Sequence, residues 1–130
     1  MGIPLDEAVR ELVDGRNFAT AATVNPDGSP QTSIIWVGRD GDDVLFSATE
    51  ARLKVRNLRR DPRISLSILD GENPYRYAEI RGTVTIEDDP ARSLPTALSH
   101  KYLGKPYPEE PPEVVRVIVR VHAEKIVSFP

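Results

Sequence analysis

Alternation of apolar and polar residues over several short stretches is the feature that most constrains this fold. Residues 64–68, 78–86 and 115–122 all change character at every second position. A period of two residues is typical of a strand with one buried face. Turn-forming residues rich in Asn, Asp, Gly and Pro occupy 25–30 and 39–43. The pattern therefore predicts antiparallel strands joined by short connections.

Six strands are expected in this single domain of 130 residues. Gly82 interrupts the alternation of one strand and marks a possible β-bulge. Six short-turned strands with a few peripheral helices predict a mainly β protein, a small barrel. The expected strands are 18–24, 31–37, 44–48, 64–68, 78–86 and 115–122.

Two helices are predicted at the edges of this sheet. Leu5, Val9 and Leu12 share one face of an amphipathic N-terminal helix. The sequence Asp88-Asp89-Pro90 resembles a cap followed by proline at the first helical position, which predicts a helix ending near residues 102–104. Pro95 would then kink this helix or make it restart with Ser93 as its cap.

A third helix is expected within a strongly basic stretch. Six of the 17 Lys and Arg residues fall between Arg52 and Arg63, although the chain carries a net charge of −3. Thr49 is expected to cap this helix, and Ala51, Val55 and Leu58 to form its buried face. Pro62 would end it. Basic side chains near the free N–H groups of a helix N-terminus predict an anion site, with phosphate as the expected anion.

Helix geometry restricts which basic residues can share one anion. Residues two apart in a helix point about 200° away from each other. Arg52 must therefore lie in the turn and Lys54 in the first helical turn, with Ser47 and Thr49 adding hydroxyl donors. The alternative is that the whole stretch is a solvated basic face, which is the favoured interpretation of the remaining arginines, Arg56, Arg59 and Arg60.

Several other classes of function are disfavoured by composition. The chain has no cysteine and only two histidines, His100 and His122, so no metal site is expected. Its pI of about 5.4 argues against nucleic acid as a partner. No signal peptide or membrane-spanning stretch is visible, so we expect a cytoplasmic protein without a membrane partner.

Aromatic residues leave alternatives open. Trp36, the only tryptophan, is expected in the core more often than as a ligand platform. Tyr75 and Tyr77 could line a cleft or pack at an edge. The segment 101–107 could belong to a site or could be a solvated helix end.

The order of these motifs resembles the pyridoxamine 5′-phosphate oxidase-like family of FMN-binding split β-barrels. The resemblance rests on the Ala-rich strand with its hairpin turn at 25–30, the Trp36 strand, the Phe46–Asn57 segment and the sequence Arg81-Gly82-Thr83-Val84. The segment 100–107 is similar to the branch of F420-dependent oxidoreductases. The resemblance covers nearly the whole chain.

This resemblance implies a flavin-type cofactor at the interface of a homodimer. It implies that the cofactor ring lies near Gln31, Ser33 and Trp36. It also implies that the partner subunit contributes Tyr75 and Lys101 to the same site. The cofactor phosphate would be held by Ser47, Thr49, Arg52, Lys54 and Asn57.

The expected activity is hydride transfer from reduced coenzyme F420 to a conjugated small-molecule substrate. An FMN-dependent reductase or oxidase and a non-catalytic carrier of cofactor or tetrapyrrole are the alternatives. The anionic tail of coenzyme F420 favours it, since Arg56, Arg59, Arg60 and Lys101 could bind such a tail. Pyridoxal phosphate synthesis is not expected, because the substrate-binding Arg and His of a further C-terminal segment are not found here. No catalytic residue is assigned, and Tyr75, Tyr77, Tyr102 and Lys101 are only candidates for a proton donor.

Overall fold

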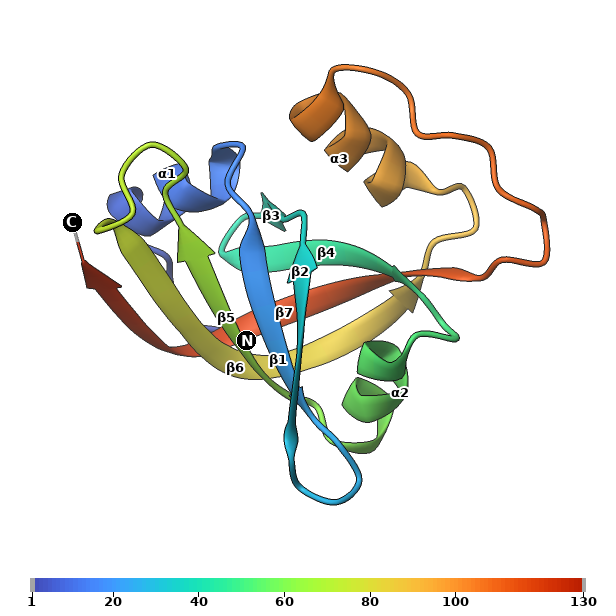
Figure 1. The fold of residues 1–130 in the computed structure, drawn as a ribbon, viewed down its shortest axis with the longest axis horizontal. Coiled ribbons are helices and arrows are strands. Elements are labelled where there is room, and N and C mark those ends of the chain that lie inside the picture. The colour runs from blue at the N-terminus through green and yellow to red at the C-terminus, as the bar shows by residue number, and fades with distance from the viewer. Residues whose placement is uncertain (1, 130) are drawn as a thin grey trace.

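Seven antiparallel strands form one sheet in the computed structural model, which describes residues 2–129 (Figure 1). Their order across the sheet is β2-β1-β5-β6-β7-β4-β3. The predicted mainly β architecture with peripheral helices is confirmed. The strands are β1 (Ala19–Val24), β2 (Pro30–Ile35), β3 (Gly38–Asp40), β4 (Asp43–Thr49), β5 (Arg63–Leu69), β6 (Tyr77–Asp88) and β7 (Arg116–Phe129).

Three helices, α1 (Glu7–Asp14), α2 (Leu53–Arg60) and α3 (Ser93–Leu103), lie around the rim of this sheet (Figure 1). α1 packs against β3, β5 and β6, α2 against β1 and β2, and α3 against β4. The core is one cluster of apolar side chains from the strands together with the buried faces of α1 and α2. Within residues 2–129, none of the helices combines the length and apolar character needed to cross a membrane.

β6 and β7 form the longest pair of strands, and both run further than predicted. Their register extends from Tyr77 opposite Phe129 to Asp88 opposite Val117. The alternation of apolar and polar residues weakens after His122, which is why the last strand was predicted to end there. The predicted bulge is confirmed, because the register shifts between Arg81 and Gly82. A side chain at position 82 would collide with the backbone carbonyl of His122.

The predicted cap of α2 is wrong. Thr49 is the last residue of β4, and Arg52 occupies the N-cap position without a side-chain cap bond. The Thr49 carbonyl accepts the Arg52 N–H at 3.1 Å, so Thr49 contributes its backbone to the turn. Ala51 precedes the helix and is exposed, whereas Val55 and Leu58 are buried as expected.

α3 begins at Ser93, three residues later than Pro90, so the predicted start is wrong. The predicted caps are wrong as well, because Arg92 occupies the N-cap position without a side-chain cap bond. The Asp89 carboxylate instead accepts the N–H groups of Ser93 and Leu94 at 2.9 and 3.0 Å. Pro95 is then the third residue of the helix, where a missing N–H removes no helical bond. One helix therefore runs to Leu103 and ends at Gly104, whose φ of 70° favours glycine.

Candidate functional site

Two adjoining hollows form a basic cleft where β2, the end of β4, the start of α2 and the start of β7 meet. They share Ser47, Lys54, Tyr107 and Arg116, so they are continuous. The polar half, about 230 Å³, is completed by Ala48, Thr49 and Arg52. The apolar half, about 220 Å³, is completed by Ile34, Ile35, Trp36, Pro95 and Leu98.

Arg52 and Lys54 are arranged as helix geometry requires. Arg52 lies in the turn before α2, and Lys54 lies in its first turn. Lys54 is only 7% exposed, yet within residues 2–129 its one hydrogen-bond partner is the hydroxyl of Ser33, at 3.3 Å from Nζ. Burial lowers the pKa of Lys54, and the positive charges of Arg52 and Arg116 lower it further. The cleft thus holds a buried ammonium with donors to spare.

Arg116 and Tyr107 also line both halves of the cleft, and sequence reasoning missed them. Arg116 opens β7 and lies opposite Thr49 in the register with β4. Its Nη2 donates to the Tyr107 hydroxyl at 2.6 Å, and its Nε donates to Glu110 at 2.8 Å. The only sequence signal is an arginine at an outward position of a valine-rich strand, which does not tell where that strand pairs.

Trp36 combines features of both alternatives that the sequence left open, a core residue and a ligand platform. It lines the apolar half of the cleft, and its ring stacks on Tyr102 at 5.3 Å with an interplanar angle of 8°. Tyr102 in turn stacks on Phe18 at 5.7 Å. The Tyr102 hydroxyl donates to the carbonyl of Asn17 at 2.6 Å. The tryptophan is therefore a wall of the cleft that is supported from behind.

Gln31 and Asn57 do not line this cleft. The Asn57 side chain is fully buried, and its Nδ2 donates to Thr23 and to Asn25, both at 3.0 Å. The Thr23 hydroxyl donates to Gln31 at 2.5 Å. These four residues join α2 to the β1–β2 hairpin. Asn57 and Gln31 thus hold the backbone that carries the cleft residues.

Tyr75 and Lys101 also lie outside the cleft. Tyr75 is 83% exposed in the loop between β5 and β6. Lys101 donates to the carbonyls of Val13 and Val37, both at 2.6 Å. Burial lowers the pKa of Lys101 to about 8, opposed by the charge of Asp14. The contributions expected of both residues to a partner's site stay predictions.

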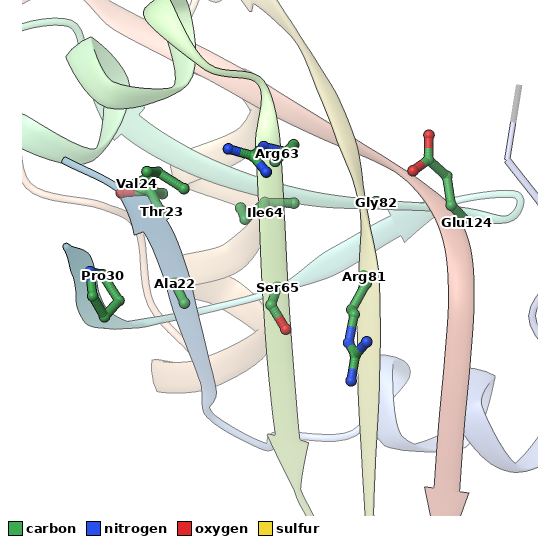
Figure 2. A pocket seen from close by; sticks show the side chains of 10 residues that line it. All are labelled: Ala22, Thr23, Val24, Pro30, Arg63, Ile64, Ser65, Arg81, Gly82 and Glu124. Atoms are coloured by element: carbon green, nitrogen blue, oxygen red, sulfur yellow. The ribbon is translucent and has the colours of Figure 1, made fainter. Parts of the chain in front are cut away.

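A separate hollow of about 320 Å³ lies over β1, β5, β6 and β7 (Figure 2). Figure 2 shows Arg63, Arg81 and Glu124 spread over three strands. Arg63 pairs with Asp61 at 2.7 Å and Arg81 with Glu79 at 3.1 Å, so both cations are already neutralised. In the part of the chain that the structure describes, Arg52 and Lys54 of the basic cleft have no such carboxylate partner, so the cleft is the better candidate site. Within residues 2–129, no three potential metal ligands gather as a metal site.

Known proteins similar to this chain support the same interpretation. The model of the pyridoxamine 5′-phosphate oxidase family matches residues 5–128. An F420 reductase of known structure is 34% identical, with a TM-score of 0.85 over 95% of this chain and 98% of its own. A conserved hypothetical protein from Mycobacterium tuberculosis is 27% identical, with a TM-score of 0.78 over 98% of this chain and 86% of its own.

A pyridoxamine 5′-phosphate oxidase-related, FMN-binding protein from Nostoc punctiforme shares the fold at 16% identity. Its TM-score is 0.71 over 95% of this chain and 82% of its own. The family match spans nearly all of the chain, and the F420 reductase is similar over nearly its whole length. The chain belongs to the pyridoxamine 5′-phosphate oxidase family, with the split-barrel architecture of flavin- and deazaflavin-type oxidoreductases.

Proposed function

We propose that the protein is an F420-dependent oxidoreductase that passes a hydride from the reduced deazaflavin to a conjugated small-molecule acceptor. The observation that carries this proposal is the shape and charge of the basic cleft. Cations line its polar half, and Trp36 lines its apolar half. A cofactor with a phosphate at one end and a planar ring at the other matches both halves. The similarity to an F420 reductase over 95% of the chain supports the same cofactor.

The residues present fit a cofactor of this kind. Arg52 and Lys54 would hold its phosphate, with hydroxyl donors from Ser47 and Thr49. Trp36 would lie against the ring. When bound, the cofactor supplies the hydride chemistry, and the protein supplies binding and orientation. FMN also has a tricyclic ring, a ribityl chain and a phosphate, so an FMN-dependent reductase or oxidase is the alternative proposal.

The anionic tail of coenzyme F420 distinguishes it from FMN and needs further cations. Arg56 is exposed on α2, next to the cleft residues in sequence. Arg59 pairs with Glu50 at 2.6 Å, and the Lys101 ammonium is held by two carbonyls. Arg60 donates to Asn57 and to the carbonyl of Val24. Of the four residues expected to bind the tail, Arg56 is therefore the strongest candidate.

The proposed assembly is a cytoplasmic homodimer with two cofactor sites at the interface. Phe18, Ile34 and Leu69 are 57%, 64% and 45% exposed and line one further hollow on the outer face of β1, β2 and β5. Exposed apolar side chains gathered on one face are typical of an interaction surface. A second copy on this face would cover these three side chains. Because Ile34 also lines the cleft, that copy would lie next to the cofactor site.

Titration of the purified protein with coenzyme F420 and with FMN under identical conditions tests this proposal. We expect tighter binding of coenzyme F420 and turnover of its reduced form with some enones or quinones. Binding of FMN alone would favour the FMN-dependent alternative. Tight binding of cofactor or biliverdin without turnover across the panel of acceptors would favour the carrier. The variant Arg63→Ala lies outside the cleft. It is the control that shows how the loss of a surface charge alone changes cofactor binding.

A further inference from the structure

We infer that Arg116 is a third cation of the anion site, acting together with Arg52 and Lys54. The inference rests on the proposed function for the identity of the ligand and adds a residue that is distant from Arg52 and Lys54 in the sequence. It is carried by the position of the guanidinium, by its incomplete neutralisation and by the hydroxyl groups beside it.

The position of Arg116 places its guanidinium inside the cleft. β7 begins at Arg116, opposite Thr49 of β4, so its side chain emerges beside those of Ser47 and Thr49. Nη1 lies 3.5 Å from the Ser47 hydroxyl, and the side chain is only 13% exposed. Arg116 lines both halves of the cleft, as Lys54 does. An anion that reaches Lys54 therefore meets Arg116 as well.

A purely structural role would require that Glu110 neutralise Arg116. Glu110 does pair with it, at 2.8 Å from Nε. The same carboxylate also lies 3.7 Å from the Arg92 guanidinium, so one negative charge serves two arginines. With Arg52 and Lys54 nearby, the cleft has more positive charge than this carboxylate can balance. Partly buried cations without matching anions are costly, and a bound anion removes that cost.

Arg52, Lys54 and Arg116 all line the polar half of the cleft, and their charges act on one another. Arg116 lies on another strand, yet its charge contributes to lowering the pKa of Lys54, as that of Arg52 does. An anion placed between the three would interact with all of them. Arginine also suits this task because its planar fork can donate two parallel hydrogen bonds to a phosphate.

Tyr107 holds Arg116 toward the cleft and adds a donor of its own. Arg116 donates to the Tyr107 oxygen at 2.6 Å, and its guanidinium lies 5.1 Å from the centre of the Tyr107 ring. The hydroxyl oxygen therefore acts as acceptor in this bond, which leaves its proton available. Because Tyr107 lines both halves of the cleft, that proton can be donated to a bound anion.

The experiment compares Arg116→Gln with Arg120→Gln in the full chain. Arg120 is a matched control, since it lies on β7, is 21% exposed and pairs with Glu87, Asp40 and Asp43 away from the cleft. The affinities for coenzyme F420 and FMN are measured by calorimetry at several salt concentrations. We expect Arg116→Gln to weaken binding by about tenfold or more and to reduce its salt dependence. Arg120→Gln should stay within about twofold of wild type.

Unchanged affinity in folded Arg116→Gln would overturn the inference and leave the proposed function intact. The variant Glu110→Gln breaks the same ion pair but keeps the cation. It should bind the cofactor at least as tightly as wild type, also where Arg116→Gln does not fold. Weaker binding by Glu110→Gln would mean that the ion pair matters only for structure, and would overturn the inference.

Absence of binding of either cofactor by wild type would contradict the proposed function. The inference is then decided with inorganic phosphate as the probe, followed through the Nε–H resonances of the arginines. We expect the Arg116 signal to shift and the Arg120 signal to stay. Equal behaviour of the two signals would overturn the inference.

Discussion

Two lysines with lowered pKa values lie in different surroundings, and their comparison separates binding from structure. The Lys54 ammonium has one hydroxyl partner at 3.3 Å and two arginines whose charges repel it. The Lys101 ammonium has two carbonyl partners at 2.6 Å, lies 4.8 Å from the Tyr102 ring centre and is attracted by Asp14. Burial is the main cause of the lowered pKa in both.

The difference lies in how many donors each ammonium has already used. Lys101 joins the end of α1, the segment between β2 and β3, and α3, through carbonyls that would otherwise lack this donor. Lys54 retains donors that face the basic cleft. A lysine whose pKa is lowered by burial is thus a poor indicator of function by itself. Its unused donors and like-charged neighbours are a better one.

Arg52 and Lys54 form the proposed clamp for the cofactor phosphate. Removal of both cations should have the largest effect on cofactor binding. Charge-assisted hydrogen bonds contribute about 1.5–3 kcal/mol each. Lys54→Ala alone should weaken binding by about tenfold or more, and Arg52→Ala with Lys54→Ala by about 10²-fold or more. Calorimetric titration of the folded variants measures this. Wild-type affinity in the double variant would refute the clamp.

Lys101→Met should act on stability instead. The loss of two charge-assisted bonds to carbonyls should lower the free energy of unfolding by about 2–3 kcal/mol. Urea unfolding followed by circular dichroism checks this, with Lys125→Met on the exposed part of β7 as the control. Cofactor affinity should change little. A large loss of affinity with unchanged stability would show that Lys101 reaches a partner's cofactor, as the resemblance implied.

The candidate proton donors should have smaller effects. A positioned general acid contributes about 10²–10⁴-fold. Tyr75 is exposed, Tyr77 stacks on Phe129 at 5.0 Å, and the Tyr102 hydroxyl is bonded to backbone groups. Changing any one of these three or Lys101 should lower kcat by less than about 10²-fold at saturating cofactor. Abolished turnover with normal affinities in one variant would identify the missing acid.

Proton uptake on binding is the most subtle effect expected. The groups that face Lys54 are the guanidinium groups of Arg52 and Arg116, the Ser33 hydroxyl and the ring of Phe46. A bound anion favours the ammonium and so raises the lowered pKa of Lys54. Binding should therefore take up a larger fraction of a proton at pH 9 than at pH 7. Calorimetry in buffers of different ionisation enthalpy measures this fraction, which Lys54→Arg should abolish.

Local patterns in the sequence predicted most of the strands and the geometry of Arg52 and Lys54. The bulge at Gly82 was also legible, because a glycine inside an alternating strand typically marks a bulge or a close backbone contact. β3 was missed, since its three residues, Gly38–Asp40, overlap a sequence that resembles a turn. The cap of α2 was misplaced because Thr49 continued its strand, where pairing with Arg116 outweighed its capping preference.

Site residues that are brought together by long-range strand pairing could not be predicted from the sequence. Arg116 reaches the cleft through the register of β4 with β7, and no local pattern specifies that register. The place of Tyr107 in the cleft could not be predicted either, because it depends on the hydrogen bond with Arg116. Asn57 was assigned to the cofactor phosphate by the resemblance. The structure places its buried amide in hydrogen bonds with Thr23 and Asn25, a role that no local pattern indicated.

The pairing of β4 with β7 has a consequence for the order of events during folding. Arg116 and Ser47 stand 69 positions apart in sequence, so the cleft closes a large loop of chain. Such distant contacts form slowly, because the entropy of closing the loop is lost before the contacts compensate for it. Arg52 and Lys54 leave the ribosome well before β7 does. A nascent chain can therefore carry Arg52 and Lys54 in a formed turn and still be unable to retain its ligand until β7 has been synthesised and has paired with β4.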